Sequence, residues 1–336
     1  MPRDVAGPLI VIPCLNEEQH ISGLLTQLSA VQARLGGQIV VVDGGSTDGT
    51  VAKTWDMARQ NPAIKLLHNP QKIQSAAINL AVACYGQTAE HLIRIDAHSD
   101  YPDDFVDRLL AEAKTVDAAS IVVSMHAKGT PFLQRVNAAA QNSPVGNGGS
   151  KHRLQSSGEF VDHGHHALIR LNAFTEVGGY DESFTHNEDA EFDHRLRDFG
   201  HKIWLTAETD LTYYPRDSLA ALGRQYFNYG KGRAQNILKH RIVPRLRQAK
   251  VMAVLPALVM ATLAIFHWVL ALPALMWAGY CLAMGLKISR QEKHPALVFT
   301  TLSAMLMHAS WSLGFWTKIL TGARKNTKEA SHDAFA

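Results

Sequence analysis

Cysteine is scarce in this chain of 336 residues, and the few cysteines present follow no metal-binding spacing. Cys14, Cys84 and Cys281 lie far apart, so the sequence contains neither a zinc-type pair nor a CxxC redox motif. This pattern favours a reducing compartment. The N-terminus has only a short apolar run followed by a polar segment, so no signal peptide is expected.

Acidic residues are missing from one part of the chain. No Asp or Glu occurs from Ser218 to Gln291. Residues 1–217 contain 18 Lys/Arg and 27 Asp/Glu, whereas residues 218–336 contain 15 Lys/Arg and 3 Asp/Glu. This asymmetry predicts different partners for the two halves. A basic flank beside apolar runs favours anionic lipid over nucleic acid.

Charges of both signs are absent from two long stretches of the C-terminal third. Residues 251–286 contain no Asp, Glu, Lys or Arg, and neither do residues 294–317. Since a spanning helix needs roughly 20 apolar residues, the second stretch fits one span. The first fits a tilted span or a hairpin broken near Pro273. The alternative is a very apolar soluble helical hairpin.

Basic residues flank both apolar stretches. Eight Lys/Arg lie between Arg224 and Lys250, three between Lys287 and Lys293, and four from Lys318 onward. The positive-inside rule places all these flanks in the cytoplasm. Because one span cannot keep both of its flanks on one side, part of this segment is expected to be re-entrant or interfacial.

Short apolar runs alternate with helix-like stretches near the N-terminus. Strands are predicted at 9–13, 38–43, 64–68 and 91–96, with helices at 17–33, 47–59 and 71–84. This alternation predicts right-handed βαβ units in an α/β domain with a mixed, mainly parallel sheet. Ligands of such sheets bind beyond the carboxyl ends of the strands. Asn16, Glu17, Asp43 and Asp96 fall at those ends.

The region from 111 to 217 is less regular. Its predicted elements are strands at 120–125 and 165–170, a polar glycine-rich loop at 142–158 and a helix at 187–200. In that helix Phe192, Leu196 and Phe199 are predicted to share one face, with Gly200 as the C-terminal cap.

The stretch VVVDGGSTDGT, residues 40–50, places Asp43 at the end of a predicted strand. One interpretation is a tight turn in which Ser46 or Thr47 caps the following helix. The other is that the Asp43 carboxylate accepts a hydrogen bond from a nucleobase imide.

Asp96 and His98 follow another predicted strand at positions i and i+2. Carboxylate and imidazole ligands suit Mn²⁺ well and Mg²⁺ less well. The alternative is that this segment simply precedes a helix starting near Pro102, which Ser99 or Asp100 would cap. Asp100 is also a possible replacement for His98 as a metal ligand.

Two further clusters carry ionisable side chains. Glu188 and Asp189 are expected in the first turn of a helix, either as favourable charges at the helix N-terminus or as a rigidly held general base. The stretch DHGHHALIR contains His163, His165 and His166. Since no cysteine or carboxylate partner has a zinc-type spacing, a polar strand facing a sugar is favoured over a zinc site.

Four motifs now stand in order: VIPCLNEE (11–18), VVVDGGSTDGT (40–50), RIDAHSD (94–100) and VGGYDESFTHNEDAEFDHRLRDFG (177–200). Together they resemble the inverting glycosyltransferases of family 2, which have the GT-A fold. The resemblance covers about residues 8–235. The forms RIDAHS and HNEDAEF, followed by RQYFNYGKGRAQ, look like those of succinoglycan-biosynthesis glucosyltransferases.

The resemblance implies a role for each matching residue. A uridine pocket would contain Pro13, Asn16, Glu17 and, on the uracil ring, Asp43. The ribose and a divalent metal, Mn²⁺ or Mg²⁺, would contact Asp96. His98 would be the second metal ligand, although the family usually has Asp at this position. The donor diphosphate would contact Lys231 and Arg233. Asp189 matches the catalytic base, and Glu188 would orient the base or the acceptor.

The function implied is transfer of one sugar, with inversion, from a UDP-sugar to a lipid-diphosphate-linked oligosaccharide in bacterial exopolysaccharide synthesis. UDP-glucose is the expected donor and a β bond the expected product, with a 1,3 linkage suggested and its position left open. A short processive synthase and a non-catalytic nucleotide-sugar scaffold are the alternatives. Other assembly proteins are possible partners, and nucleic acid is not expected.

The expected organisation places the enzyme at the bacterial inner membrane, with its catalytic domain facing the cytoplasm. The predicted parts are a catalytic domain over 1–235, a basic juxtamembrane segment over 236–250, two or three membrane-associated helices over 251–320 and a polar cytoplasmic tail over 321–336.

Overall fold

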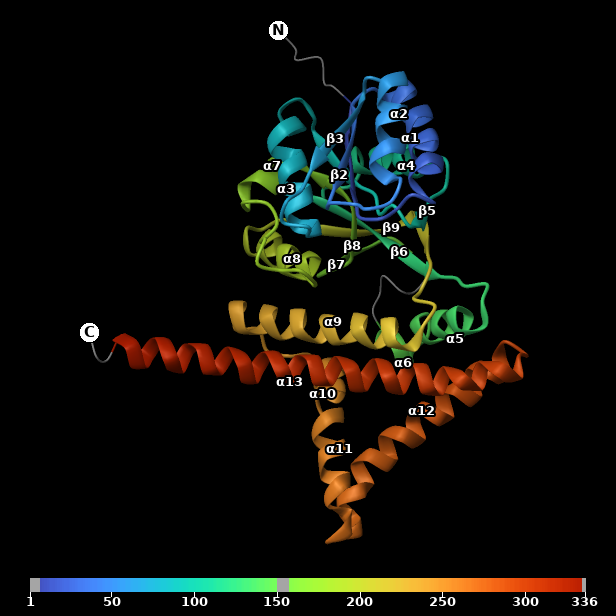
Figure 1. Cartoon of the computed structure of the whole chain (residues 1–336), viewed down its shortest axis with the longest axis vertical. Coiled ribbons are helices and arrows are strands. Elements are labelled where there is room, and N and C mark those ends of the chain that lie inside the picture. The colour runs from blue at the N-terminus through green and yellow to red at the C-terminus, as the bar shows by residue number, and fades with distance from the viewer. Residues whose placement is uncertain (1–6, 150–156, 334–336) are drawn as a thin grey trace. The chain divides into compact units, whose positions relative to one another are not determined.

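The structure is a computed structural model that describes residues 7–149 and 157–333, with side chains as far as residue 322. It divides into two compact units, shown together in Figure 1. Unit 1 comprises Met1–His126 and Leu154–Tyr213, and unit 2 comprises Ala127–Arg153 and Tyr214–Ala336. The domain boundary predicted at residue 235 therefore falls within unit 2.

Unit 1 is built on one mixed sheet. Its parallel part has the order β3-β2-β1-β4, formed by β1 (Leu9–Cys14), β2 (Gln38–Asp43), β3 (Ile64–His68) and β4 (His91–Arg94). The sheet continues through β8 (His165–Arg170), β6 (Ser120–Ala127), β9 (Ile203–Tyr213) and β5 (Ser99–Asp100), and β7 (Glu159–Val161) pairs with β9. The β4–β8 and β6–β8 pairs are antiparallel. The predicted mixed α/β sheet is confirmed.

Helices cover both faces of this sheet, and in Figure 1 α1 and α2 lie opposite α3 and α7. The helical elements of unit 1 are α1 (Ile21–Leu35), α2 (Thr50–Gln60), α3 (Gln74–Tyr85), η1 (Gly86–Thr88), α4 (Phe105–Ala113), α7 (Leu171–Glu176) and α8 (Glu188–Asp198). On one face, alternate strand residues such as Val11 and Val40 pack with Ile78 and Phe192 in a buried cluster. Side chains two residues apart point to the same side of a strand, which explains why alternate strand residues join this cluster.

Two predicted helix caps are wrong. Helix α2 begins at Thr50 after Gly49, and neither Ser46 nor Thr47 caps it. Asp48 takes that role locally, since its Oδ1 accepts the Thr50 N–H at 3.0 Å. Ser99 and Asp100 do not cap the helix expected near Pro102, because they form β5 opposite Tyr213 and Thr212.

The helix predicted over 187–200 is confirmed at its start and at its glycine cap, since Gly200 follows the last turn with φ +87° and its N–H donates to the Arg197 carbonyl oxygen. One residue of its predicted face is wrong. Helix α8 begins at Glu188, as expected, and Phe192 and Leu196 are buried. Phe199 is 55% exposed, because it follows the last helical residue and leaves the predicted face. The predicted 142–158 loop contains the short helix α6 (Pro144–Asn147), and its residues 150–156 lie outside the described part.

Unit 2 is helical. Its other elements are α5 (Phe132–Gln141), α9 (Leu219–His240), α10 (Leu246–Met252), α11 (Val254–Thr262), η3 (Leu263–Ile265), η4 (Trp268–Ala271), α12 (Leu272–Gln291), η5 (Pro295–Phe299) and α13 (Thr300–Asp333). Three segments are long and apolar enough to cross a membrane: Leu246–Ile265, Trp268–Gln291 and Pro295–Gly322. The hairpin turns near Phe266, not at Pro273, which sits in the first turn of α12.

Within unit 2, α9 and α13 pack with their backbones in close approach. A Cβ on Gly230 would lie 2.0 Å from the carbonyl oxygen of Trp311, and one on Gly314 would lie 1.9 Å from that of Phe227. Both positions therefore require glycine for steric reasons. The closeness extends the van der Waals contact between the two helices.

We expect Gly230→Ala to destabilise unit 2 by about 1–3 kcal/mol, because the added methyl must push two backbones apart. Gly279→Ala on α12 is the matched control, since a Cβ there meets nothing within 4 Å. The alanine should be neutral or slightly stabilising there. Thermal unfolding of the detergent-solubilised chain measures both, and an unchanged midpoint for Gly230→Ala would contradict the packing argument.

Candidate active site

The first group of predicted residues meets in the turn after β2. The Asp43 carboxylate accepts the backbone N–H groups of Gly45, at 2.8 Å, and Ser46, at 3.1 Å. The Asn16 N–H donates to Ser46 Oγ at 2.8 Å, and Asn16 Oδ1 accepts the Thr47 N–H at 2.8 Å. These bonds hold the loops after β1 and β2 together. Asp43 thus has a definite structural role in the turn, whatever else it binds.

The loop after β1 also reaches the residues that follow β4. Glu17 Oε1 lies 3.0 Å from His98 Nδ1. The backbone N–H of Glu17 donates to Thr50 Oγ1 at 2.8 Å, which fixes the start of the loop. Pro13 lies in β1 opposite Val42. Asn16, Glu17 and His98 therefore lie together beyond the carboxyl ends of β1 and β4, as predicted from the strand ends, and Pro13 lies nearby in β1.

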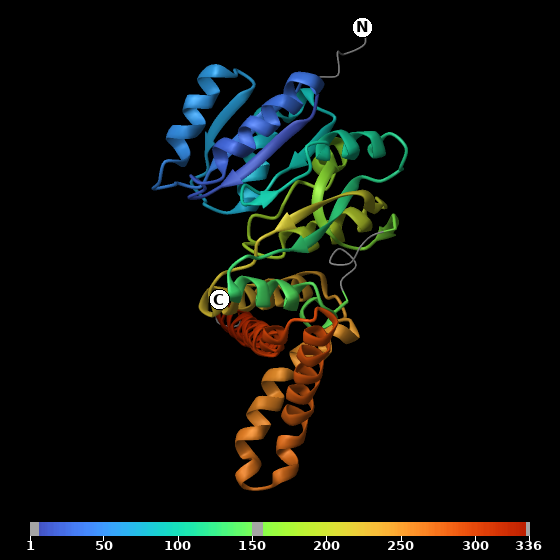
Figure 2. The ribbon, with the colours of Figure 1, turned by 90° about the vertical axis from the view of Figure 1, so that its right-hand side faces the viewer.

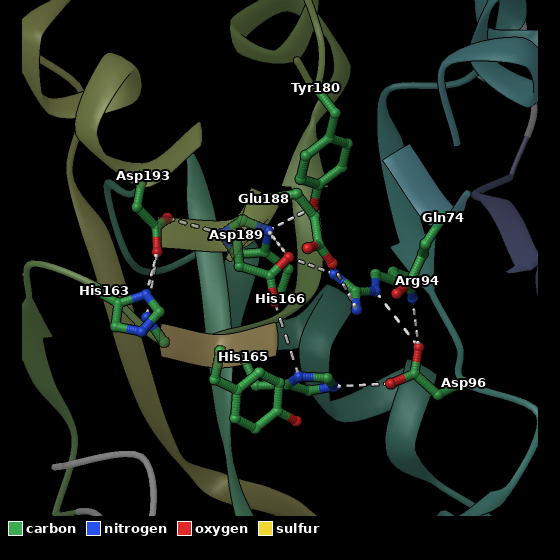
Figure 3. Close-up of polar contacts among 12 residues, drawn as sticks. Gln74, Arg94, Asp96, His163, His165, His166, Tyr180, Glu188, Asp189 and Asp193 are labelled. Carbon is green, nitrogen blue, oxygen red and sulfur yellow. Dashed lines mark hydrogen bonds and ion pairs between the residues drawn. The ribbon is translucent and has the colours of Figure 1, made fainter. Parts of the chain in front are cut away.

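Arg94 is the centre of the site (Figure 3). It is the last residue of β4 and only 5% exposed, and it forms ion pairs with carboxylates on both sides. Its Nε lies 3.4 Å from Asp96 Oδ1 and its Nη2 lies 4.0 Å from Glu188 Oε1, while Nη1 donates to Asp189 Oδ1. One buried cation therefore joins the acid after β4 to the two acids of α8.

The two acids at the start of α8 have different protonation behaviour. Burial and the neighbouring Asp189 carboxylate raise the pKa of Glu188 to about 7. Burial would also raise the pKa of Asp189, but Arg94 and His166 outweigh it and lower that pKa. At neutral pH Asp189, the predicted base, is therefore ionised, whereas Glu188 is only partly ionised. Pairs whose environments separate their pKa values are typical of acid–base sites.

Asp96 is held in its ionised form. Burial would raise its pKa, but the guanidinium of Arg94 and the nearby histidines lower it to about 2. Its Oδ1 also accepts a hydrogen bond from Gln74 Nε2 at 2.9 Å. The other oxygen, Oδ2, lies 3.4 Å from His165 Nε2. Burial lowers the pKa of His165 to about 4, so this imidazole is neutral at physiological pH.

His166 contacts Asp189, and Asp193 in turn contacts His166. His166 is fully buried and lies 2.7 Å from Asp193 Oδ1 and 3.4 Å from Asp189 Oδ1, and its Nδ1 meets the Tyr180 hydroxyl. Asp193 Oδ2 lies 3.1 Å from His163 Nδ1. All three histidines of the DHGHH stretch therefore have a carboxylate partner on α8, since His165 Nδ1 also lies 4.0 Å from Asp189 Oδ2. Among the described residues, no group of three or more metal-type ligands forms a metal site.

The predicted diphosphate ligands lie in unit 2, on α9. Lys231 Nζ lies 5.8 Å from the centre of the Phe227 ring, at cation–π range. Burial lowers the pKa of Arg233 to about 10, and the charges of Arg247 and Arg245 act in the same direction. Their contact with a diphosphate stays a prediction.

Arg94, Gln74 and Asp193 were not identified as site residues from the sequence, and His165 and His166 were expected only on a polar strand facing a sugar. Arg94 had a usable signal, because a charged residue inside the apolar run HLIRI needs a buried partner. The other four act through contacts between segments far apart in the chain, which local spacing does not reveal. His165 and His166 are brought to Asp96 and Asp189 by the antiparallel pairing of β8 with β4.

The His166–Asp193 pair predicts a pH-dependent stability. Burial would lower the pKa of His166, but Asp193 and Asp189 raise it above its ordinary value of 6.5. A raised pKa in the folded state contributes stability that is complete below pH 6.5 and is lost as pH rises through the folded value. The wild type should therefore lose melting temperature as pH rises above 6.5, relative to Asp193→Asn. Parallel curves for the two proteins would contradict this.

Comparison with known proteins identifies the class. The model of "Glycosyl transferase family 2" matches residues 9–178. The chain belongs to this family, has its GT-A fold and is a glycosyltransferase.

Among individual proteins, the chain is 48% identical over 317 residues to "Succinoglycan biosynthesis protein ExoA" of Rhizobium meliloti (strain 1021), covering 94% of this chain and 96% of that protein. Among solved structures, the mannosyltransferase PcManGT of Pyrobaculum calidifontis, in complex with GDP-Man and Mn²⁺, has a TM-score of 0.57 at 18% identity and covers 93% of this chain and 90% of its own. The structure of GalNAc-T7 with UDP, GalNAc and Mn²⁺ has a TM-score of 0.50 at 14% identity, and the match covers 76% of this chain and 51% of that chain. These two likenesses concern the fold.

The ligand types beside Asp96 fit a divalent metal such as Mn²⁺. A carboxylate with one oxygen facing a neutral imidazole combines the oxygen and nitrogen donors that Mn²⁺ accepts. The predicted ligands Asp96 and His98 follow the same strand, and His165 adds an imidazole that was not predicted.

Proposed function

We propose that this glycosyltransferase is membrane-associated and transfers a single sugar, with inversion, from a nucleotide-diphosphate donor to a lipid-diphosphate-linked oligosaccharide. UDP-glucose is the proposed donor and a β-linked glucose the proposed product. The pathway proposed is bacterial exopolysaccharide synthesis of the succinoglycan kind, supported by 48% identity to ExoA. The proposed location is the inner membrane, supported by three segments apolar enough to span one.

The observation that carries the mechanism is the Arg94 cluster. It joins Asp96, at the end of a parallel strand where nucleotides bind, to Asp189, which is ionised and lies in the first turn of α8. A donor-side acid and an acceptor-side base are thus fixed on rigid elements of the same unit. General base catalysis requires such a fixed, ionised group.

In the proposed reaction, Asp189 accepts the proton of an acceptor hydroxyl. The oxygen attacks the anomeric carbon from the face opposite the diphosphate, the bond to the donor phosphate oxygen breaks, and an α-linked donor gives a β-linked product. Glu188, whose pKa is raised to about 7, keeps a protonated fraction at neutral pH that can donate a hydrogen bond to the acceptor. A metal held by Asp96 and His98 would neutralise the charge that grows on the leaving diphosphate.

The donor is proposed to contact the loops after β1, β2 and β4. Pro13, Asn16 and Glu17 would line the uridine pocket, and Asp43 would accept a hydrogen bond from uracil. The bonds that already connect Asn16 with Ser46 and Thr47 support this, because they make the two loops one preorganised edge. Lys231 and Arg233 remain proposed contacts of the diphosphate.

The test is a product assay with the purified full chain in lipid. Several radiolabelled UDP-sugars, and GDP-mannose as a control donor, are offered with lipid-linked acceptors and Mn²⁺. We expect UDP release only when a matching acceptor is present, and a product longer by one sugar. A ladder of long products would favour a processive synthase, and donor binding without release would favour a scaffold.

The Mn²⁺ dependence of three variants distinguishes among the candidate metal ligands His98, His165 and Asp100. His98→Ala should raise the Mn²⁺ concentration needed for half-maximal activity, and His165→Ala should do so as well, because each removes an imidazole near Asp96. Asp100→Ala is the control, since Asp100 lies in β5 and is exposed. A metal requirement changed only by Asp100→Ala would overturn the assignment of His98.

A further inference from the structure

Unit 2 carries an apolar hairpin that projects away from α9 and α13 (Figure 2). One leg contains α10, α11 and η3, and the other contains η4 and α12. The tip exposes Ile265, Phe266 and Trp268, at 84%, 78% and 69%. The uncharged stretches of the two legs are residues 251–266 and 268–286. The base of each leg packs on α13, where the Leu255 N–H donates to Ser312 Oγ at 3.0 Å and Trp277 Nε1 donates to His308 Nδ1 at 3.1 Å. The parts beyond these contacts, residues 256–266 and 268–276, reach about 16 Å and 14 Å at 1.5 Å per residue, which is about half of the roughly 30 Å hydrocarbon core.

The third apolar segment, α13, is different because it is packed along α9. Leu222 of α9 shares a buried cluster with Met307 of α13. Gly230 meets Trp311 farther along, and a Cβ on Gly322 would lie 3.4 Å from Leu238 Cδ1. The two helices therefore run parallel to each other from about residues 222 and 307 to residues 238 and 322.

Helix α9 cannot accompany α13 through a bilayer. Over the paired stretch and its end it carries Arg224, Lys231, Arg233 and Lys239. Each charge at the centre of a bilayer is strongly disfavoured. Because the backbones of α9 and α13 meet at glycines, α13 cannot leave α9 without losing this packing. The packing therefore keeps α13 out of the hydrocarbon core, although its composition would allow a span.

The distribution of basic residues along the sequence also favours a position of α13 outside the hydrocarbon core. Basic residues lie before the hairpin, directly after it at 287–293, and again from Lys318. With three spans, the groups before and after the membrane region would lie on opposite sides, against the positive-inside rule. With a hairpin that enters and leaves the bilayer on the same side, and no crossing by α13, all three groups lie on one side.

We propose that only the α11–α12 hairpin enters the bilayer, that both of its ends stay on the same side, and that α9 and α13 lie together on an anionic leaflet. The surface of α13 fits this position, since Leu302, Leu313 and Leu320 are exposed at intervals that place them on one side of the helix. Exposed leucines beside basic residues are typical of helices that lie in the headgroup region. The lipid chemistry is that of anionic phospholipid.

Reporter fusions to the full-length chain in a bacterial host test the topology. Green fluorescent protein reports a cytoplasmic terminus, and alkaline phosphatase reports an outside terminus because it needs disulfides. We expect the N-terminal and C-terminal fusions to report the same side. Opposite sides would indicate three spans and overturn the proposal, as would a wild-type chain that alkaline carbonate washes from the membrane.

Two arginine variants test the membrane positions of the hairpin and of α13 independently. Met276 of α12 is 75% exposed and Leu313 of α13 is 47% exposed. Met276→Arg should cause a several-fold loss of carbonate-resistant protein, because it places a charge within the hydrocarbon core. Leu313→Arg should be retained like wild type, since its charge would reach the headgroups. Equal release of both variants would overturn the proposal.

These tests do not depend on the proposed reaction. Membrane retention and terminal location are measured without donor or acceptor, so loss of transferase activity would leave the result unchanged. The fusion experiment uses the unaltered sequence, and it therefore decides the topology even if an arginine variant misfolds. Vesicles of zwitterionic lipid should bind the purified chain more weakly than vesicles containing anionic phospholipid.

Discussion

Asp189→Asn is expected to lower the transfer rate about 10²- to 10⁴-fold, the usual contribution of a general base. Asparagine has nearly the shape of aspartate but cannot accept the acceptor proton. Donor binding should persist, because Asp189 is not among the residues proposed to hold the nucleotide. The measurement pairs single-turnover transfer with donor binding by calorimetry.

The matched control for this substitution is Asp198→Asn at the other end of α8. Its carboxylate is 59% exposed and lies 3.6 Å from His194 Nδ1, so its loss should leave transfer close to wild type. If Asp189→Asn kept near wild-type turnover while donor still bound, the base assignment would be wrong. Loss of donor binding as well would indicate that the substitution had disturbed Arg94, which thermal unfolding would reveal.

Arg94→Met is expected to reduce the free energy of unfolding by about 3–5 kcal/mol, because it leaves buried carboxylates without their cation. Arg94 is 5% exposed, and Asp96 and Asp189 both depend on it for their lowered pKa values. In the variant these pKa values should rise, so the deficit should shrink as pH falls. Denaturant unfolding of the full chain at two pH values measures both effects.

Arg34→Met provides the comparison for an exposed pair. Arg34 Nη2 lies 2.7 Å from Asp107 Oδ2, but the two side chains are 52% and 34% exposed. Solvent screens such a pair, and its loss should cost about 0–1 kcal/mol. Adding Asp189→Asn to Arg94→Met should recover part of the stability, since one uncompensated charge is removed. If Arg94→Met were no worse than Arg34→Met, the cluster would not have the stabilising role inferred here.

The parts of the fold that follow from local pattern could be predicted from the sequence. The first three strands were located within a residue, because runs such as QIVVVD are apolar on both faces and end at polar turns. Asp189 was correctly placed in the first turn of a helix, while its role as the base comes from the family resemblance and stays a proposal. Helix starts were less certain, since Ser46 Oγ accepts the N–H of Asn16, 30 positions away, and it is Asp48 that accepts the Thr50 N–H.

The contacts that organise the site could not be derived in this way. Arg94 meets Asp189 across 95 positions, and His166 meets Asp193 across 27. Both contacts depend on the position of β8, which pairs with β4 in antiparallel fashion. An irregular stretch of chain precedes β8, so the local sequence pattern does not reveal this pairing. The parallel packing of α9 with α13 was hidden for a similar reason, because the glycines that permit it look ordinary in sequence.

The pairing of α9 with α13 also sets an order of events during synthesis. Helix α9 ends at His240, whereas α13 begins only at Thr300. During translation at about 5–20 residues per second, α9 must wait several seconds for its partner. Residues of the hairpin leave the ribosome in that interval, so its insertion can anchor the nascent chain before α9 is covered. A ribosome stalled before residue 300 would therefore hold a chain whose α9 face is open to chaperones.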